Sequence, residues 1–307
     1  MRMLVVGAGS TGGYFGARLA AAGRDVTFLV RPARAAQLAQ DGLQVRSPAG
    51  DLALQTRLVT ADRIDGPYDA VLLTVKAYAL DAALRDVAPA VGPQTMVLPV
   101  LNGMRQVEAI TQHFGAQALA GCVCKVAAEL DPQGRIIHLA PFHDLAYGEM
   151  SGEESARMRA LDTFMQDAGF TARLSPVIQR EMWEKWVLLA SLGAITSLMR
   201  GNIGEVQAAP GGEAFANALL DEVVGLVQAV GTAPSESFLA TARAQLTAKD
   251  SKQTSSMYRD LLKGAPIEAE QIVGDLLARG RQAGVAAPLL SAAFTHLSVY
   301  QNRLAQP

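Results

Sequence analysis

The sequence has little cysteine: Cys122 and Cys124 are the only two in 307 residues. They stand two positions apart in an apolar, strand-like stretch, where alternation places both side chains on one face. Neighbours at this spacing seldom reach disulfide geometry, and no second pair completes a zinc site. We therefore expect two inert thiols in a protein core, and no bound metal.

Long apolar runs and basic runs are also missing. The longest apolar stretch, Trp186–Met199, is too short to cross a bilayer. Glycines between Gly7 and Gly13 interrupt the apolar N-terminus, which argues against an export signal. The formal net charge is −2 and no long basic run occurs, so nucleic acid and membrane surfaces are poor partners. These features predict a cytoplasmic protein that binds neither.

What the sequence does contain is the pattern of two domains. In the first half, apolar strand-like runs alternate with helical stretches, which predicts a parallel sheet with crossover helices. An Asp-Pro-Gln-Gly turn at Asp131–Gly134 then predicts an antiparallel hairpin. We expect an α/β Rossmann-type domain over residues 1–174. Its predicted strands are Met3–Val6, Val26–Val30, Ala70–Val75, Met96–Leu101, Cys122–Ala128, Arg135–Leu139, Asp144–Glu149 and Thr171–Leu174, with helices at Gly13–Ala22 and Ser155–Gly169.

After Ser175-Pro176 the strand signals disappear, and glycine and proline separate a series of helical stretches. We therefore expect an all-α domain over residues 175–307. Its predicted helices are Ile178–Met199, Glu213–Val230, Glu236–Ala248, Thr254–Lys263, Pro266–Ala283 and Pro288–Leu304.

A glycine motif follows the first predicted strand and opens the first helix. It reads Gly7, Ala8, Gly9, Ser10, Thr11, Gly12. In such motifs the first glycine permits a tight turn, the second lets backbone approach a pyrophosphate, and the third lets helix and strand pack closely. Because strand, helix and spacing all agree, we interpret these residues as a dinucleotide-binding loop. The alternative is a glycine-rich turn without a ligand.

The end of the second predicted strand indicates which dinucleotide binds. NAD-binding versions place a carboxylate there, about twenty residues after the glycine motif, to accept from the ribose 2′-OH. This chain has Arg31 instead, and Arg34 adds a second positive charge nearby. A guanidinium binds a 2′-phosphate through charge-assisted hydrogen bonds. NADP(H) is the predicted cofactor, and a solvent-facing arginine is the alternative.

Five further segments form an ordered series along the chain: Leu73-Thr74-Val75-Lys76-Ala77, Leu101-Asn102-Gly103-Met104, Glu181-Met182-Trp183-Glu184-Lys185, Ser255-Ser256-Met257-Tyr258-Arg259-Asp260 and Pro266-Ile267-Glu268. Together they resemble the ordered signature of the ketopantoate reductase (2-dehydropantoate 2-reductase) family. The resemblance runs over nearly the whole chain. It implies NADPH-dependent reduction of ketopantoate, or a related 2-oxo acid, to the 2-hydroxy acid, as in pantothenate biosynthesis. It implies a small-molecule substrate and leaves a homodimer open.

By this resemblance, Lys185 is the catalytic general acid. The helix after it is apolar almost all round. An ammonium beside such a surface is partly desolvated, which helps it to release a proton. The alternative is an ion pair with Glu181, one helical turn earlier and in the favourable orientation.

Asn102 and Lys76 each follow a predicted central strand, at the end where open α/β sheets bind ligands. An amide at Asn102 suits either the nicotinamide carboxamide or the substrate carbonyl. Its alternative is turn formation in an Asn-Gly pair. Lys76 resembles a family position near the cofactor, and a surface lysine is the rival interpretation.

The resemblance makes Glu268 the carboxylate that holds the substrate hydroxyl, and Ser256 a contact of the substrate carboxylate. For Glu268 the alternative is structural: if Pro266 is the first helical residue, Glu268 is the third, where glutamate often caps a helix. For Ser256 the alternative is a hydroxyl on a helix surface.

The sequence also departs from the family pattern, which usually has asparagines four and eight residues after the catalytic lysine. Here those positions hold Leu189 and Gly193. The true substrate is therefore open, and a relative that reduces a more apolar ketone or imine is one alternative. A non-catalytic NADP(H)-sensing protein is another, although it has no use for a proton donor such as Lys185.

Overall fold

A computed structural model describes residues 1–305 of the chain. Contacts divide it into two compact units. The first unit contains Met1–Leu101 and Gln106–Gln179, and the second contains Asn102–Arg105 together with the chain from Arg180 onward. The first two residues of the long helix that begins at Ile178 thus group with the first unit. This follows from packing, because the side chain of Ile178 lies against Gly121 and Gly148.

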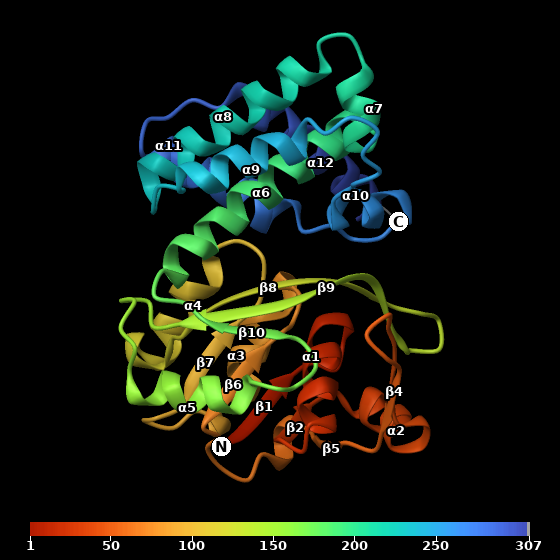
Figure 1. Ribbon diagram of the computed structural model, residues 1–307, viewed down its shortest axis with the longest axis vertical. Helices are drawn as coiled ribbons and strands as arrows, with labels where there is room; N and C mark the ends of the chain where they lie inside the picture. The colour runs from red at the N-terminus through yellow and green to blue at the C-terminus, as the bar shows by residue number, and fades with distance from the viewer. Residues whose placement is uncertain (306–307) are drawn as a thin grey trace. The chain divides into compact units, whose positions relative to one another are not determined.

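The first unit is built on a five-stranded parallel sheet, drawn red to orange in Figure 1. Its spatial order is β5-β2-β1-β6-β7, and all four pairings are parallel. In chain order this is third, second, first, fourth and fifth, the order of Rossmann-type sheets. The predicted fold class is therefore confirmed. The strands are β1 (Arg2–Val6), β2 (Asp25–Leu29), β5 (Arg57–Val59), β6 (Ala70–Leu73) and β7 (Met96–Pro99).

Both faces of this sheet are buried, because successive side chains of each strand enter different cores. In β1, Met3 and Val5 belong to one hydrophobic core, while Leu4 and Val6 belong to the other. Such double burial explains why the central strands read as continuous apolar runs. The covering helices are α1 (Ser10–Ala21), α3 (Leu80–Val87) and α4 (Arg105–Phe114), and α2 (Pro32–Asp41) follows β2.

A second sheet lies on the other side of α1. Helix α1 and this second sheet pack so closely that a Cβ on Gly13 would come within 2.4 Å of Ile136 Cδ1. The expected hairpin is present, but its second strand continues through the segment expected as a separate strand at Asp144–Glu149. Cys122 and Cys124 lie in this hairpin as free thiols. The elements are β3 (Leu43–Arg46), β4 (Leu52–Leu54), β8 (Gly121–Leu130), β9 (Ile136–Gly148), β10 (Thr171–Leu174) and helix α5 (Ala156–Met165).

The second unit is helical, as expected, and is drawn green to blue in Figure 1. One short helix, α7, was not predicted; it begins with a capping box in which Asn202 and Glu205 bond each other's backbone N–H. The helices are α6 (Ile178–Met199), α7 (Ile203–Ala208), α8 (Gly212–Val230), α9 (Glu236–Leu246), α10 (Ser256–Leu262), α11 (Asp275–Gln282) and α12 (Pro288–Leu304), with a π-helical turn, η5, at Glu270–Gly274.

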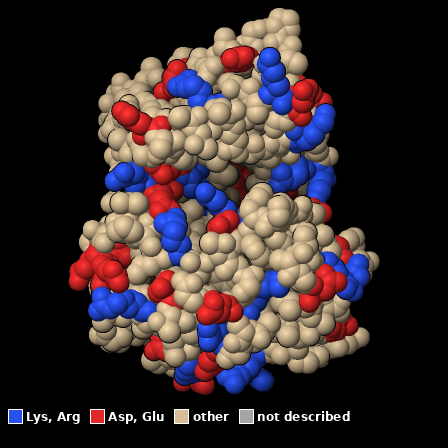
Figure 2. Space-filling view, viewed as in Figure 1, with Lys and Arg blue, Asp and Glu red and all other residues tan. Residues whose placement is uncertain are grey.

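Apolar helix length and the distribution of charge characterise the described residues of both units. Within residues 1–305, no helix is long and apolar enough to span a bilayer. On the face shown in Figure 2, blue and red side chains are interspersed among neutral ones, and neither sign forms a continuous field.

The turn from β1 into α1 is held by close backbone packing. Gly7 adopts φ +99°, a conformation that favours glycine. The Thr74 hydroxyl donates to the carbonyls of Val6 (2.7 Å) and Gly7 (3.1 Å). A Cβ on Gly12 would come within 2.1 Å of Thr74 Oγ1 and 2.3 Å of the Gly7 carbonyl oxygen, whereas a Cβ on Gly9 would meet nothing within 4 Å.

We expect substitutions at these two glycines to separate folding from ligand binding. Gly12→Ala forces backbone atoms apart and should lower the free energy of unfolding by ~1–3 kcal/mol or more. Gly9→Ala should change it by less than ~1 kcal/mol, because its Cβ has free space and only helix-cap preference is altered. Urea unfolding of both variants measures this. Equal destabilisation by the two changes would contradict the packing described here.

Candidate functional site

Three of the predicted cofactor-binding features lie at one edge of the parallel sheet. The glycine motif follows β1, Arg31 follows β2, and Lys76 follows β6. These strands are neighbours in the order β2-β1-β6, so their carboxyl ends share an edge. Ligands of open α/β sheets bind at such an edge. The first unit therefore places these three features at one end of its parallel sheet.

The glycine motif has the geometry that a dinucleotide pyrophosphate requires. Gly9, the residue before α1, has an extended backbone and open space beside its Cα. The first turn of a helix leaves N–H groups without intrahelical acceptors, and these groups bind anions. A side chain at Gly9 would fill the space that a phosphate needs. The residues present thus fit a nicotinamide dinucleotide.

Arg31 and Lys76 are both exposed and both precede a helical turn. Arg31 lies directly before α2, whose first residue is Pro32, and its guanidinium makes no hydrogen bond that caps this helix. Lys76 lies directly before a short 3-10 turn at Ala77–Ala79. Each long cationic side chain therefore starts at the carboxyl edge of the sheet, with no burial that would hold it away from a ligand.

Thr74 is a residue that the sequence analysis did not single out. It follows β6 and joins this strand to the glycine motif through its two hydrogen bonds to Val6 and Gly7. The only sequence signal was its place in the Leu73–Ala77 segment, as the first polar residue after a buried strand. Its role here is to fix the glycine turn.

In the second unit, two of the predicted substrate residues come together. The Asn102 amide nitrogen lies 3.4 Å from Glu268 Oε2, at the long end for a hydrogen bond. Glu268 is only 8% exposed, and a buried carboxylate requires polar partners. An amide and a carboxylate from distant parts of the sequence therefore form one polar group.

The structure corrects the expected start of the helix near Glu268. The sequence suggested a helix from Pro266, which would make Glu268 its third residue and a helix cap. Helical structure instead begins at Ala269, and residues 265–268 are extended or irregular. Glu268 therefore precedes the helix. The residue before it, Ile267, donates its N–H to Gln301 Oε1 at 3.2 Å, a contact outside the helix. Capping at the third helical position is excluded.

The segment after Glu268 contains the π-helical turn η5, and Trp186 holds it. The indole Nε1 of Trp186 donates to the Ile272 carbonyl at 2.9 Å, and the ring is 1% exposed. Gly103 also lies against this turn, since a Cβ there would come within 2.7 Å of the Gln271 carbonyl oxygen. π-helical turns are rare in proteins, and those that occur often lie at functional sites. Trp186 was not predicted for this role.

Lys185 is half-buried and directly precedes Trp186 on α6. Leu189 and Gly193 follow on the same helix face, at one and two further turns. The space at Gly193 is filled by Met257, whose Cε would lie 2.7 Å from a Cβ on that glycine. Met257 is 2% exposed, so an apolar group occupies the place where the family pattern has an amide.

Ser256 is the first residue of α10, and its side chain is exposed. The neighbouring Ser255 is buried and caps α10 by accepting from the Tyr258 N–H. Ser255 Oγ also lies 2.9 Å from Thr196 Oγ1 of α6. Ser255 is therefore structural, whereas the hydroxyl of Ser256 is open to solvent.

Comparison with known proteins agrees with this geometry. The model of "Ketopantoate reductase PanE/ApbA" matches residues 3–152, and that of its C-terminal part matches residues 177–301. An uncharacterized oxidoreductase of Bacillus subtilis, YkpB, is 32% identical over 98% of this chain and 99% of its own. A 2-dehydropantoate 2-reductase of Mesorhizobium japonicum is 29% identical over 95% of each chain.

A solved structure gives the same result. The 2-dehydropantoate 2-reductase of Geobacter metallireducens superposes with a TM-score of 0.87 at 28% identity, over 97% of this chain and 99% of its own. Matches to both parts of the family model cover most of the sequence. The chain therefore belongs to the ketopantoate reductase family of NADP(H)-dependent oxidoreductases.

Proposed function

We propose that the protein uses NADPH to reduce ketopantoate, or a related 2-oxo acid, to the 2-hydroxy acid, as in pantothenate biosynthesis. The observation that carries this proposal is the contact of Asn102 with the buried Glu268. Together they offer an amide donor and a carboxylate acceptor to a small ligand that carries carbonyl and hydroxyl groups. A purely structural pair would not require a carboxylate.

For the cofactor, we propose that the backbone from Gly7 to Gly12 binds the pyrophosphate and that Arg31 binds the ribose 2′-phosphate. Lys76 and Asn102 would contact the remainder of the cofactor. The nicotinamide of NADPH supplies the hydride that adds to the substrate carbonyl carbon. The exposed side chain of Arg31 supports the choice of NADPH, because it makes no capping hydrogen bond to α2 and is accessible to a phosphate.

Lys185 is the proposed general acid. As the carbonyl carbon accepts a hydride, its oxygen becomes an alkoxide that needs a proton. The Lys185 ammonium donates that proton and regains one from water, so that the product is a hydroxyl group. Its half-buried position supports this role, because partial burial limits hydration of the ammonium.

In addition to Lys185 and Asn102, we propose Ser256 and Glu268 as substrate-binding residues. The exposed Ser256 hydroxyl donates to the substrate carboxylate, and the Glu268 carboxylate accepts from a substrate hydroxyl. Binding at both ends orients the carbonyl, and orientation is a large part of catalysis in such reactions.

One observation favours a substrate more apolar than ketopantoate. Leu189 and Met257 place alkyl and thioether groups on the face of α6 that Lys185 begins, and no side chain extends from Gly193. An apolar wall discriminates weakly between substrates and favours apolar ones. A 2-oxo acid with an alkyl or aromatic side chain is therefore the second candidate.

A non-catalytic NADP(H)-sensing protein is the candidate from another class. It would need the glycine motif and Arg31, but it has no need of a half-buried lysine, a buried carboxylate with an amide partner, and an open serine. The chain retains all of these in the second unit. This retention favours the enzyme.

Cofactor preference should depend on Arg31. We expect Arg31→Asp to weaken NADPH binding by ~1.5–3 kcal/mol, the scale of a hydrogen bond to a charged group. NADH should lose much less, because it has no 2′-phosphate. Fluorescence titration of both cofactors measures the ratio. An equal loss of affinity for both cofactors, or a wild type that prefers NADH, would contradict this role of Arg31.

Turnover should depend on Lys185. We expect Lys185→Ala to lower kcat by ~10²–10⁴ while the dissociation constant of NADPH stays nearly unchanged. Glu181→Gln serves as the control, since it removes the alternative ion-pair partner and keeps the lysine. If Lys185→Ala kept normal turnover and only lowered the melting temperature, as Glu181→Gln would, the role of Lys185 would be structural.

Amides at Leu189 and Gly193 should shift selectivity towards ketopantoate. We expect Leu189→Asn with Gly193→Asn to raise its kcat/KM at least ~10-fold, the value of one or two hydrogen bonds. The Cβ of the new side chain at Gly193 meets only the flexible end of Met257. The matched control is Leu198→Asn, a half-buried leucine nine residues further on α6 and on its opposite face.

Stability must be measured beside activity in these variants, because Leu189 is partly buried. Efficient turnover of ketopantoate by the wild type, with no gain in the double variant, would show that other groups bind its hydroxyl. An equal gain from Leu198→Asn would show that the effect is not local.

A further inference from the structure

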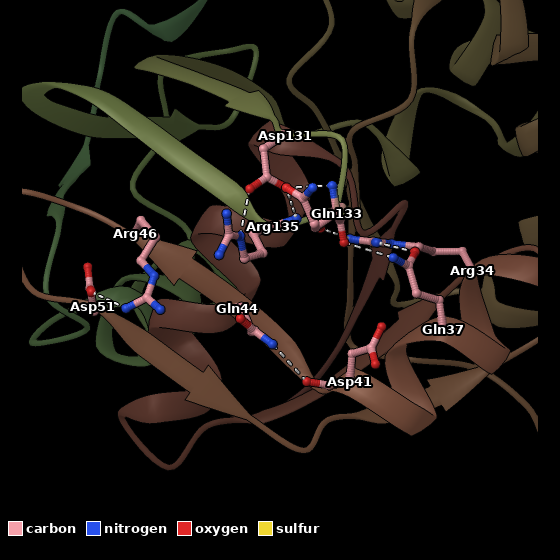
Figure 3. Close-up of polar contacts among 10 residues, drawn as sticks. Arg34, Gln37, Asp41, Gln44, Arg46, Asp51, Asp131, Gln133 and Arg135 are labelled. Atoms are coloured by element: carbon pink, nitrogen blue, oxygen red, sulfur yellow. Dashed lines mark hydrogen bonds and ion pairs between the residues drawn. The ribbon is translucent and has the colours of Figure 1, made fainter.

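Arg34 makes contacts that its neighbour in the same helical turn, Arg31, does not make. From the first turn of α2, its Nη2 donates to the Ala8 carbonyl at 3.1 Å and to the Gly134 carbonyl at 2.9 Å. Its Nη1 donates to Gln37 Oε1 at 2.7 Å. One guanidinium thus connects the glycine motif to the turn of the β8–β9 hairpin, toward which Arg34 and Gln37 both point in Figure 3.

The hairpin turn is built to receive this guanidinium. Asp131 holds its shape by accepting from the N–H groups of Gln133 (3.0 Å) and Arg135 (2.8 Å). Gly134 has φ +75°, and a Cβ there would come within 2.5 Å of Arg34 Nη1. Glycine is therefore required at this position by both the backbone and the arginine. The turn presents a fixed carbonyl to Arg34.

The contact with Ala8 has a consequence on the other side of its peptide bond. In a trans peptide the carbonyl and the following N–H point in opposite directions. An Ala8 carbonyl held by Arg34 therefore directs the Gly9 N–H away from Arg34. A Cβ on Gly9 would meet no atom within 4 Å, so the backbone here is open to a ligand. A charged donor on the carbonyl also polarises the amide and strengthens its N–H as a donor.

We infer that Arg34 is a positioning residue for the cofactor pyrophosphate, acting through the Ala8–Gly9 peptide rather than by touching the cofactor. The inference rests on the proposed use of the glycine motif for that pyrophosphate. It gives the two arginines of this helical turn different roles. Arg31 distinguishes NADPH from NADH, whereas Arg34 serves the diphosphate that both cofactors share.

The test compares three ligands by fluorescence or calorimetric titration. We expect Arg34→Gln to weaken NADPH and NADH by the same factor, about 10- to 100-fold, the equivalent of one charge-assisted hydrogen bond. Adenosine 2′-phosphate, which lacks the diphosphate, should bind Arg34→Gln as it binds the wild type. Arg34→Lys keeps a charged donor and should show a smaller loss, again equal for both cofactors.

Gln37→Ala is the matched control. Gln37 bonds the same hairpin turn, through Gln133 O at 2.9 Å, and bonds Arg34, but it has no bond to Ala8. We expect it to leave cofactor affinity nearly unchanged. A loss equal to that of Arg34→Gln would show that only the tethering of the hairpin matters, and would overturn the inference.

Two further outcomes would overturn it. A loss confined to NADPH and adenosine 2′-phosphate would make Arg34 a direct ligand of the 2′-phosphate. Unchanged affinity for both cofactors would mean that the Ala8 contact has no effect. If Arg34→Gln fails to fold, Arg34→Lys gives the same comparison. A wild type that binds NADPH but reduces no 2-oxo acid would refute the proposed function and leave these binding results valid.

Discussion

Burial of both faces of the parallel sheet is the constraint on which the first unit depends. A sheet covered on both sides leaves only its edges and ends for binding. The parallel order β5-β2-β1-β6-β7 then gathers the residues that follow β1, β2 and β6 at one end. The glycine motif, Arg31 and Lys76 all lie at this end because the hydrophobic cores hold the strands in register. Thr74 and Arg34 complete the arrangement, since each holds a carbonyl of the glycine motif by hydrogen bonds.

In the second unit, burial of the Glu268 carboxylate is the main constraint on the structure around the candidate site. Burial of a carboxylate is costly unless polar groups meet it, and Asn102 supplies one such group. The backbone beside it departs from α-helical geometry over Glu270–Gly274 and is held by the indole of Trp186. Because Trp186 follows Lys185 on α6, one helix carries the proposed proton donor and also holds the turn that follows Glu268, the carboxylate proposed to bind the substrate hydroxyl.

Much of this could be predicted from the sequence, and the failures have physical reasons. Strands that are buried on both faces appear in the sequence as continuous apolar runs. The spacing of the glycine motif predicts its turn into a helix. The Rossmann-type unit was therefore predictable. The short α7 was missed because its six residues carry little periodicity. The start of the helix after Glu268 was placed too early because Pro266 is an ordinary first helical residue, whereas tertiary contacts at Ile267 delay the helix to Ala269.

Roles that depend on contacts across the chain were beyond sequence reasoning. The sequence indicates only that Arg34 adds a positive charge near Arg31. In the structure its guanidinium donates to carbonyls 26 and 100 residues away. Trp186 and Met257 likewise act on Ile272 and Gly193 through space. The ligand-binding and catalytic roles expected for the site residues stay predictions; these residues are Lys185, Ser256, Lys76, Asn102, Glu268 and Arg31.

The most direct test of the central claim is oxidation of NADPH by the wild-type protein in the presence of 2-oxo acids. The panel should include ketopantoate and 2-oxo acids with branched alkyl and aromatic side chains, and the product should be identified chemically. The account predicts saturable NADPH oxidation with at least one of them and formation of the matching 2-hydroxy acid. Tight binding of NADPH with no oxidation by any 2-oxo acid would contradict it and favour a sensing protein.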